Sequence, residues 1–172
     1  RRSYHINQVE KLGKAMDVSE YYYARNYKAA FVPYPIPPLG KMDSGIMTIS
    51  RLKANSAKRV SLPVSFTWPV RTVNLKRCLL ISRTKVKGTG KELVYINLHL
   101  EAYDKGAGKK AQTRALNRIL KQEAAKGNYV IAAGDFNQTF NNVDTNEYKV
   151  QKGLWKPGII DISEYDSSLN FV

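Results

Sequence analysis

The chain has 172 residues, of which 28 are Lys or Arg and 14 are Asp or Glu, so its formal net charge is +14. This length fits one domain, and a hydrophobic content of 43% is typical of a globular protein. No apolar run is long enough to span a membrane, and Cys78 is the single cysteine, which excludes an internal disulfide and a cysteine zinc cluster.

The excess of positive charge favours a polyanionic partner such as nucleic acid or an anionic lipid surface, with simple solubility as an equal alternative. The basic residues are spread along the chain, which predicts a broad basic face rather than a basic arm. The single cysteine favours a cytoplasmic location. Secretion stays open, because the chain starts abruptly at Arg1-Arg2 and a targeting segment could have been removed.

The first fifty residues predict one helix and two strands. Residues 5–16 place apolar side chains roughly on one side of a short helix. Residues 21–31 are rich in strand formers, and a second strand is expected at 45–50. The segment between them, 33–40, is a proline-rich loop. Asp43, just before the second strand, is an exposed turn residue on this interpretation.

The middle of the chain predicts further strands joined by a hairpin turn. A short strand is expected at residues 58–62 and a long one at 77–86, with Arg77 at its start. Residues 87–91 combine glycines and lysines, which favour a hairpin turn. A phosphate-binding loop fits this segment less well, because no helix follows it directly.

The next strand, residues 92–100, has side chains of alternating character. Every second residue from Val94 to Leu100 is apolar, and Tyr95, Asn97 and His99 point the other way. His99 therefore stands at the end of the strand on its less apolar face. A lone histidine in such a place is more often a hydrogen-bonded structural residue than a catalytic one.

Residues 109–126 are the clearest helix, and Gly127 follows as its stop signal. The helix is expected to present one apolar stripe to the core, made of Ala111, Ala115, Leu116, Ile119, Leu120 and Ala124. Strand, helix and strand over residues 93–134 form a βαβ-like unit. If its strands run parallel, His99 and Asp135 lie at the same end of the sheet.

A short apolar run at residues 129–133 is expected to be a buried strand, and Gly134 lets the backbone turn after it. Asp135 and Asn137 follow at the carboxyl end of the strand, where sites collect in layered α/β proteins. Asp supplies a metal ligand or proton acceptor, and Asn a neutral donor for a phosphoryl oxygen. A plain Asx turn after a strand explains these residues equally well. Beyond residue 142 the pattern weakens, with a short strand expected at 159–162.

Two segments together carry a family resemblance. Asn-Leu-His-Leu at 97–100, then a helix, then Gly-Asp-Phe-Asn at 134–137 resembles the endonuclease/exonuclease/phosphatase superfamily, the DNase-I-like fold. Segments 43–51 and 74–80 are similar to two further strands of that family. The resemblance implies an α/β (α+β) fold of four layers, with two β-sheets face to face and helices outside.

The resemblance also implies an activity, the Mg²⁺-assisted hydrolysis of a phosphate ester, with Mn²⁺ or Ca²⁺ as alternative ions. Asp135 would orient the attacking water and provide a weak metal ligand. Asn137 would hold a non-bridging phosphoryl oxygen, and His99 would donate to the same phosphate. The substrate stays undecided among DNA, RNA, a phosphoinositide and a sphingomyelin-like lipid, because specificity in this family lies in loops.

Three further residues receive supporting roles from the same resemblance. Arg77 is expected to contact the substrate phosphate, with Arg71 as the competing candidate. Asp43 is expected to support the active-site histidine, His99.

Two features of the family have no counterpart in this sequence, namely a metal-binding Glu on an early strand and a late Ser-Asp-His. Glu10 and Glu20 lack the strand setting, and no histidine follows Asn137. Residues 1–172 are therefore expected to form a single, partial domain of an active parent enzyme, with weak or no activity of their own. The alternative is a non-catalytic module on the same fold that binds nucleic acid or another polyanion.

Overall fold

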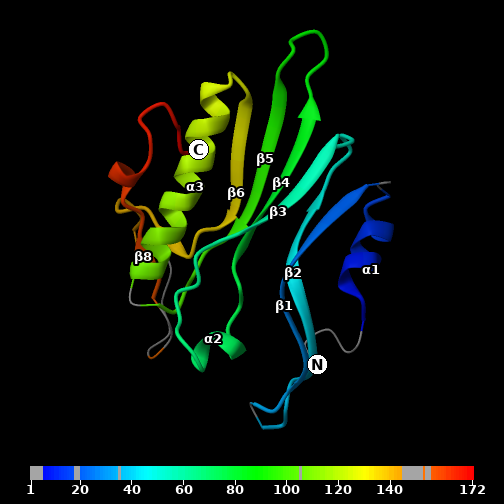
Figure 1. Ribbon diagram of the computed structural model, residues 1–172, viewed down its shortest axis with the longest axis vertical. Helices are drawn as coiled ribbons and strands as arrows, with labels where there is room; N and C mark the ends of the chain where they lie inside the picture. The colour runs from blue at the N-terminus through cyan, green and yellow to red at the C-terminus, as the bar shows by residue number, and fades with distance from the viewer. Residues whose placement is uncertain (1–5, 18–19, 35, 105, 145–152, 154–155) are drawn as a thin grey trace.

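The centre of the molecule is a four-stranded sheet in the order β3-β4-β5-β6 (Figure 1). Strands β3 (Ser56–Ser61), β4 (Cys78–Lys85) and β5 (Glu92–His99) pair antiparallel, and β6 (Tyr129–Asp135) pairs parallel to β5. The computed structural model describes residues 6–17, 20–34, 36–104, 106–144, 153 and 156–172. The predicted hairpin between β4 and β5 and the predicted βαβ unit are both confirmed.

One face of this sheet packs against helix α3 (Ala107–Ala125), which runs along β6 and β5 (Figure 1). The alternation in β5 sends every second side chain into this core. The buried cluster combines residues of β4, β5 and α3, including Leu79, Ile81, Ile96, Leu98, Leu116 and Leu120. The strands, with a period of two residues, and the helix, with a period of 3.6 residues, thus place their apolar side chains in one shared layer.

The buried face of α3 is more polar than its apolar stripe predicts. Leu116 and Leu120 are buried as expected, but Ala124 is exposed, so its place in the stripe is wrong. Polar side chains occupy the rest of this face because they bind the loops beneath it. Gln112 is fully buried, accepts from the Glu101 N–H at 2.9 Å and donates to the Pro63 carbonyl at 2.8 Å.

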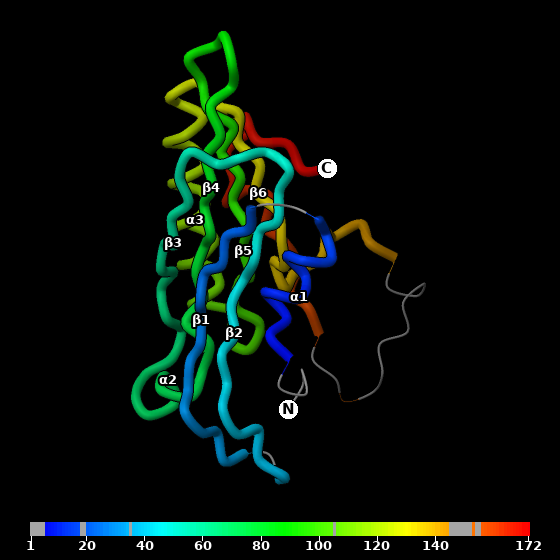
Figure 2. Tube along the Cα trace, turned by 90° about the vertical axis from the view of Figure 1, so that its right-hand side faces the viewer, coloured from blue at the N-terminus to red at the C-terminus, as the bar shows by residue number. Residues whose placement is uncertain are grey.

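The other face of the sheet packs against an antiparallel hairpin of β1 (Tyr21–Val32) and β2 (Gly40–Ile49). Ala24 of β1 packs with Cys78 and Leu80 of β4 in a second core. The Asn97 amide crosses between the sheets and donates to the Met47 carbonyl at 2.8 Å. The β1–β2 hairpin thus packs against the four-stranded sheet, and both run along the long axis of the molecule (Figure 1, Figure 2).

Strand β2 starts earlier than its sequence suggests, because its pairing with β1 extends through the segment that precedes the apolar residues. Asp43 lies within β2, opposite Lys28, so its predicted place in a turn is wrong. Helix α1 (Gln8–Ala15) lies beside the hairpin on the side away from the four-stranded sheet (Figure 1). Its Gly13 lies directly over the ring of Tyr21.

Four short elements complete the described part of the chain: α2 (Val70–Val73), β7 (Gln138–Thr139), β8 (Gly158–Ile159) and the 3-10 helix η1 (Ile162–Glu164). The strand expected at 159–162 ends at Ile159, because a 3-10 turn begins at Ile162. Strands β7 and β8 pair in parallel, and η1 contacts α3. In the described ranges, no helix has the length and apolar character needed to cross a membrane.

Candidate functional site

The ends of β5 and β6 bring the two most informative residues of the sequence together. His99 and Asp135 are direct partners in the parallel pairing of these strands. His99 Nε2 lies 3.5 Å from Asp135 Oδ2. The expected juxtaposition is therefore present, and it follows from the parallel register of the βαβ unit.

Gly134 makes this close approach of the two strands possible. Its φ of +145° lies where L side chains are rarely found, and a Cβ here would stand 2.1 Å from the Leu98 carbonyl oxygen. Directly after it, the Asp135 carbonyl accepts from the Leu100 N–H at 2.8 Å. Because Gly134 has no side chain, β6 can approach β5 closely, and Asp135 lies next to the end of β5.

Asn137 is fixed by two hydrogen bonds to the same region. Its backbone N–H donates to Asp135 Oδ1 at 2.8 Å, and its side-chain Nδ2 donates to the Leu100 carbonyl at 2.9 Å. The residue takes a left-handed conformation with φ of 52°. This is the Asx turn that the sequence allows as the plain alternative. An amide nitrogen carries two N–H groups, so one remains for a ligand.

Arg77 and Glu101 form a buried ion pair close to His99. Arg77 is 4% exposed and Glu101 is 3% exposed, and Arg77 Nε lies 3.6 Å from Glu101 Oε2. Glu101 Oε1 accepts from the backbone N–H groups of Ala102 and Tyr103. Arg77 Nε and Nη1 have no hydrogen-bond partner among the described residues. The guanidinium is therefore a buried positive charge with unused donors.

The electrostatic setting favours a neutral His99. Burial lowers the pKa of the imidazole, and the neighbouring Arg77 charge lowers it further, while Asp135 and Glu101 act in the opposite direction. The lowered pKa keeps the ring unprotonated around neutral pH. A neutral imidazole can donate one hydrogen bond and accept another.

Lys109 is a member of the site that sequence reasoning missed. It is 9% exposed, and its Nζ donates to the Asn137 carbonyl at 2.9 Å. Burial lowers the pKa of this ammonium, and Asp104, Glu101 and Asp135 oppose the shift. The available signal was its place in the first turn of α3, directly after the loop that leaves His99. That turn must lie over the end of the sheet when strand, helix and strand form a βαβ unit.

Asp43 and Arg71 belong to β2 and α2, whereas His99 and Asp135 belong to β5 and β6. The Asp43 carboxylate receives two hydrogen bonds from Arg25, at 2.7 and 2.9 Å, and these bonds, helped by the Arg25 charge, lower the pKa of this carboxyl. It also accepts from the Tyr23 hydroxyl at 3.3 Å. Its described partners thus come from β1, and support of His99 stays a prediction. Arg71 is an exposed residue of α2.

The donors of the described residues do not make up a complete magnesium site. Within the described ranges, no cluster of three or more His, Cys, Asp or Glu side chains could hold a metal ion. The Asp135 side chain is 58% exposed, whereas Glu101 is buried in its pair with Arg77. Because Mg²⁺ requires near-octahedral oxygen ligation, Asp135 would need ligands from outside these residues.

Comparisons with known proteins identify the fold. No family profile and no curated protein matches the chain. Among solved structures, the human Nocturnin catalytic domain with bound sulfate is 15% identical, covers 83% of this chain and 51% of its own, and has a TM-score of 0.52. Truncated Caenorhabditis elegans TDP2 is 16% identical, with coverages of 86% and 50% and a TM-score of 0.50.

A conserved protein of unknown function from Enterococcus faecalis V583 is 18% identical, covers 82% of this chain and 52% of its own, and has a TM-score of 0.52. The chain thus spans about half the length of each of these three structures. This chain therefore shares the fold of these structures over most of its length, as its motifs at residues 97–100 and 134–137 predict.

Proposed function

We propose that this chain is part of a metal-dependent hydrolase of phosphate esters. The observation that supports this most directly is the meeting of His99, Asp135 and Asn137 at the paired ends of β5 and β6. The buried charges of Arg77 and Lys109 lie next to this group. A phosphate ester is an anion, and these residues supply hydrogen-bond donors and positive charge together.

Each of the three residues has a role that its contacts suit. The neutral His99 ring donates a hydrogen bond to the phosphate as charge develops on it. The exposed Asp135 carboxylate orients the attacking water, and the remaining N–H of the Asn137 amide holds a non-bridging oxygen. Removing one such preorganised donor typically lowers the rate by about 10²–10³.

Arg77 and Lys109 are the two buried, positively charged residues beside this group. Lys109 is engaged with the Asn137 carbonyl, so it positions that residue and adds positive potential. The direct contact of Arg77 with phosphate remains a prediction, and its unused Nε and Nη1 are the donors that would make it. Even without contact, a buried guanidinium attracts an anion strongly because little solvent screens it.

The metal and the full sandwich belong to the proposed parent domain. A bound Mg²⁺ would neutralise the phosphate and the leaving oxygen. Asp135 is the side chain of this chain that would reach it, together with carboxylates from outside residues 1–172. The four-layer arrangement would likewise be completed by that longer protein, since this chain spans about half the length of the three solved structures.

The test compares hydrolysis by the 172-residue chain and by the longer protein that contains it. With Mg²⁺, the longer protein is expected to hydrolyse a phosphodiester, and Asp135→Ala is expected to abolish this activity. The 172-residue chain should show little or no turnover, and the same substitution should change little. Robust Mg²⁺-dependent turnover by the short chain, lost on Asp135→Ala, would show that its own residues complete the metal site.

A second candidate function is a non-catalytic module that holds nucleic acid or another polyanion. The net charge of +14 favours it, and so does the lack of a metal-holding cluster among the described residues. The two proposals predict different behaviour of the longer protein. Tight binding of DNA or RNA without Mg²⁺-dependent turnover would favour the non-catalytic module over the hydrolase.

A further inference from the structure

Two segments at one end of the molecule expose large apolar side chains, namely the tip of the β1–β2 hairpin and the segment of α2 (Figure 1). Ile36 is 91% exposed, Trp68 81% and Tyr34 77%. We call the exposed apolar residues of both segments the apolar end, and they are Phe31, Tyr34, Ile36, Trp68, Val70 and Val73. Single exposed apolar residues are common on soluble proteins, but a group of them at one end indicates a binding surface.

The pairing of the strands explains why both segments reach the same end. The Lys76 N–H donates to the Asn26 carbonyl at 2.9 Å, which fastens the segment after α2 to the middle of β1. From there β1 runs on to the hairpin tip, and the tip and α2 lie at the lower end of both views (Figure 1, Figure 2). Leu79 at the start of β4 pairs with Leu98 at the end of β5. The α2 segment therefore leaves the sheet at the end where His99 stands.

Nearly all of the net charge of +14 lies in the part of the chain that carries the apolar end. Residues 21–91 contain 14 of the 28 Lys and Arg but, in Asp43, only one of the 14 Asp and Glu, which leaves a net charge of +13. The Asp43 carboxylate is itself bound by Arg25. Although basic residues are spread along the whole chain, the positive charge that acidic residues do not balance is concentrated in this part.

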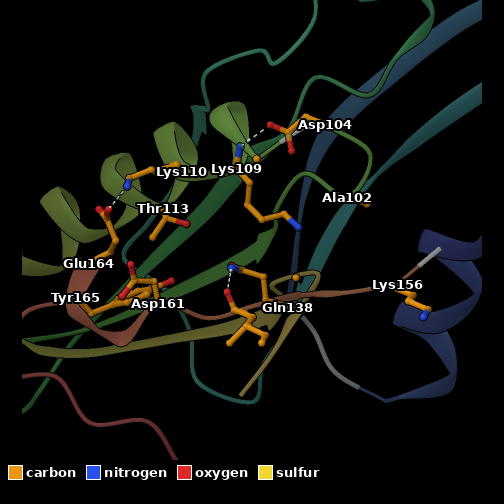
Figure 3. Close-up of a pocket in the computed structure, with 13 residues that line it drawn as sticks. Ala102, Asp104, Lys109, Lys110, Thr113, Gln138, Lys156, Asp161, Glu164 and Tyr165 are labelled. Carbon is orange, nitrogen blue, oxygen red and sulfur yellow. Dashed lines mark hydrogen bonds and ion pairs between the residues drawn. The ribbon is translucent and has the colours of Figure 1, made fainter. Parts of the chain in front are cut away.

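The rest of the chain is nearly balanced, as a cavity next to the candidate site shows. This cavity of about 400 Å³ lies between the first turns of α3, the β7–β8 pair and η1 (Figure 3). Its charged lining residues are Asp104, Asp161, Glu164, Lys109, Lys110 and Lys156. Glu164 is paired with Lys110 at 2.9 Å. By contrast, the exposed Lys41 and Arg71 beside the apolar end take part in none of the ion pairs of the described residues.

We propose that the apolar end docks the protein on the surface of a membrane that carries anionic lipids. Trp and Tyr rings are favoured at the level of the headgroups, and aliphatic side chains gain from burial at the boundary with the acyl chains. The surrounding Lys and Arg are attracted to the anionic headgroups. Nucleic acid suits this surface less well, because Ile36, Val70 and Val73 have no aromatic face on which a base could stack.

This docking surface goes beyond the proposed hydrolysis and does not depend on it. Because α2 leaves the sheet at the end of β5, docking would turn the end that carries His99 and Asp135 toward the membrane.

The first test is co-sedimentation of the 172-residue chain with lipid vesicles. One set consists of phosphatidylcholine alone, and the other also contains about 30% phosphatidylglycerol, which is anionic. Binding to the anionic vesicles is expected to be at least about tenfold tighter, because each Lys or Arg near the surface adds attraction. Equal binding to both sets, or binding to neither, would overturn the proposal.

The double variant Ile36→Ser and Trp68→Ser removes the two most exposed side chains of the apolar end and leaves the charge unchanged. It should weaken binding to the anionic vesicles by about tenfold or more, since affinity rises with the apolar area that is buried. Leu52→Ser is the matched control. Leu52 is also exposed and has basic neighbours, Arg51 and Lys53, but it follows the opposite end of β2. Its loss should be less than about threefold, and equal losses would contradict the proposal.

Tryptophan fluorescence provides a measurement that leaves the apolar end unchanged. Trp155→Phe makes Trp68 the single tryptophan of the chain. On anionic vesicles its emission should shift to shorter wavelength, and lipids with brominated acyl chains should quench it, because the indole leaves water for the membrane interface. Unchanged emission from vesicle-bound protein would show that Trp68 stays in water and would overturn the proposal.

Two further outcomes concern other occupants of this surface. If the double variant weakened binding of a DNA or RNA oligonucleotide as much as binding of vesicles, the apolar end would be a nucleic-acid surface and the proposal would be wrong. The longer protein that contains this chain should bind the same vesicles. If it did not, the rest of that protein would cover the apolar end, which would also overturn the proposal. A longer protein that docks on vesicles but never hydrolyses a phosphate ester would refute only the hydrolase.

Discussion

At the scale of single residues, His99 links the candidate site to the pH dependence of folding. Burial and the Arg77 charge lower its pKa below the ordinary value of 6.5. The unfolded chain therefore takes up a proton at a pH where the folded chain does not. Stability consequently falls as the pH drops below about 6.5 toward the folded-state pKa.

His99→Gln should remove this part of the pH dependence. Urea unfolding at about pH 7.5 and about pH 5.5 is expected to show a smaller loss of stability on acidification in the variant than in the parent chain. The same comparison with Asn97→Gln, a polar neighbour that does not titrate, controls for changes in packing. An identical loss in the His99 variant and the parent chain would contradict the lowered pKa.

Gly134 provides a second prediction at this scale. Gly134→Ala should destabilise the folded chain by about 3 kcal/mol or more, because φ is positive and the new Cβ would collide with the Leu98 carbonyl. Gly88→Ala is the matched control, since Gly88 also has a positive φ of +77° but nothing within 4 Å of a Cβ. Its cost should be about 1–2 kcal/mol in the same urea unfolding experiment. Similar costs at both positions would show that β6 moves away from β5 easily.

At the scale of elements, one ion-pair cluster ties β4, β5 and α3 together at the end of the sheet remote from the site. Arg83 contacts Glu123 through two hydrogen bonds, at 2.9 and 2.7 Å, and Glu92 at 3.0 Å. Lys126 and Asn128 also donate to Glu123. These hydrogen bonds, with that to Arg83 first, lower the pKa of Glu123 to about 2.

Glu123→Gln should therefore cost about 3 kcal/mol at neutral pH. Since the folded-state pKa is depressed, the stabilisation is present above about pH 4.5 and is lost as the pH falls toward about 2. The difference between variant and parent chain in thermal or urea unfolding should shrink over that window. Glu92→Gln is the control, and its cost should be about 1 kcal/mol or less because Glu92 makes a single, partly exposed contact with Arg83.

At the scale of the whole molecule, the net charge of +14 predicts salt-sensitive binding to polyanions. Counterion release makes affinity fall with salt in proportion to the number of phosphates neutralised. Binding to DNA, RNA and anionic vesicles should weaken steeply between about 50 and 200 mM salt, measured by fluorescence anisotropy and vesicle co-sedimentation. Affinity that is absent at low salt, or unchanged by salt, would contradict a polyanion-binding face.

The sequence by itself determined the βαβ unit and the positions of the three central site residues. Period-2 alternation in residues 92–100 and the helical pattern after it are local properties, since they depend on which face of one element is apolar. His99, Asp135 and Asn137 were found because they directly follow or end strands. Their meeting then required only that β5 and β6 run parallel, which a helical crossover favours.

Only the tertiary structure decided which groups surround these residues. Lys109 stood only as the first residue of the predicted helix 109–126, yet packing over the sheet end buries it beside Asn137. Asp43 pairs with Arg25 because the β1–β2 register brings residues 18 positions apart together, and no local pattern specifies that register. Arg77 is buried because β4 has layers on both faces. Burial and long-range pairing depend on how elements pack, and for that reason the charge balance of the site and its neighbouring cavity could not be predicted from the sequence.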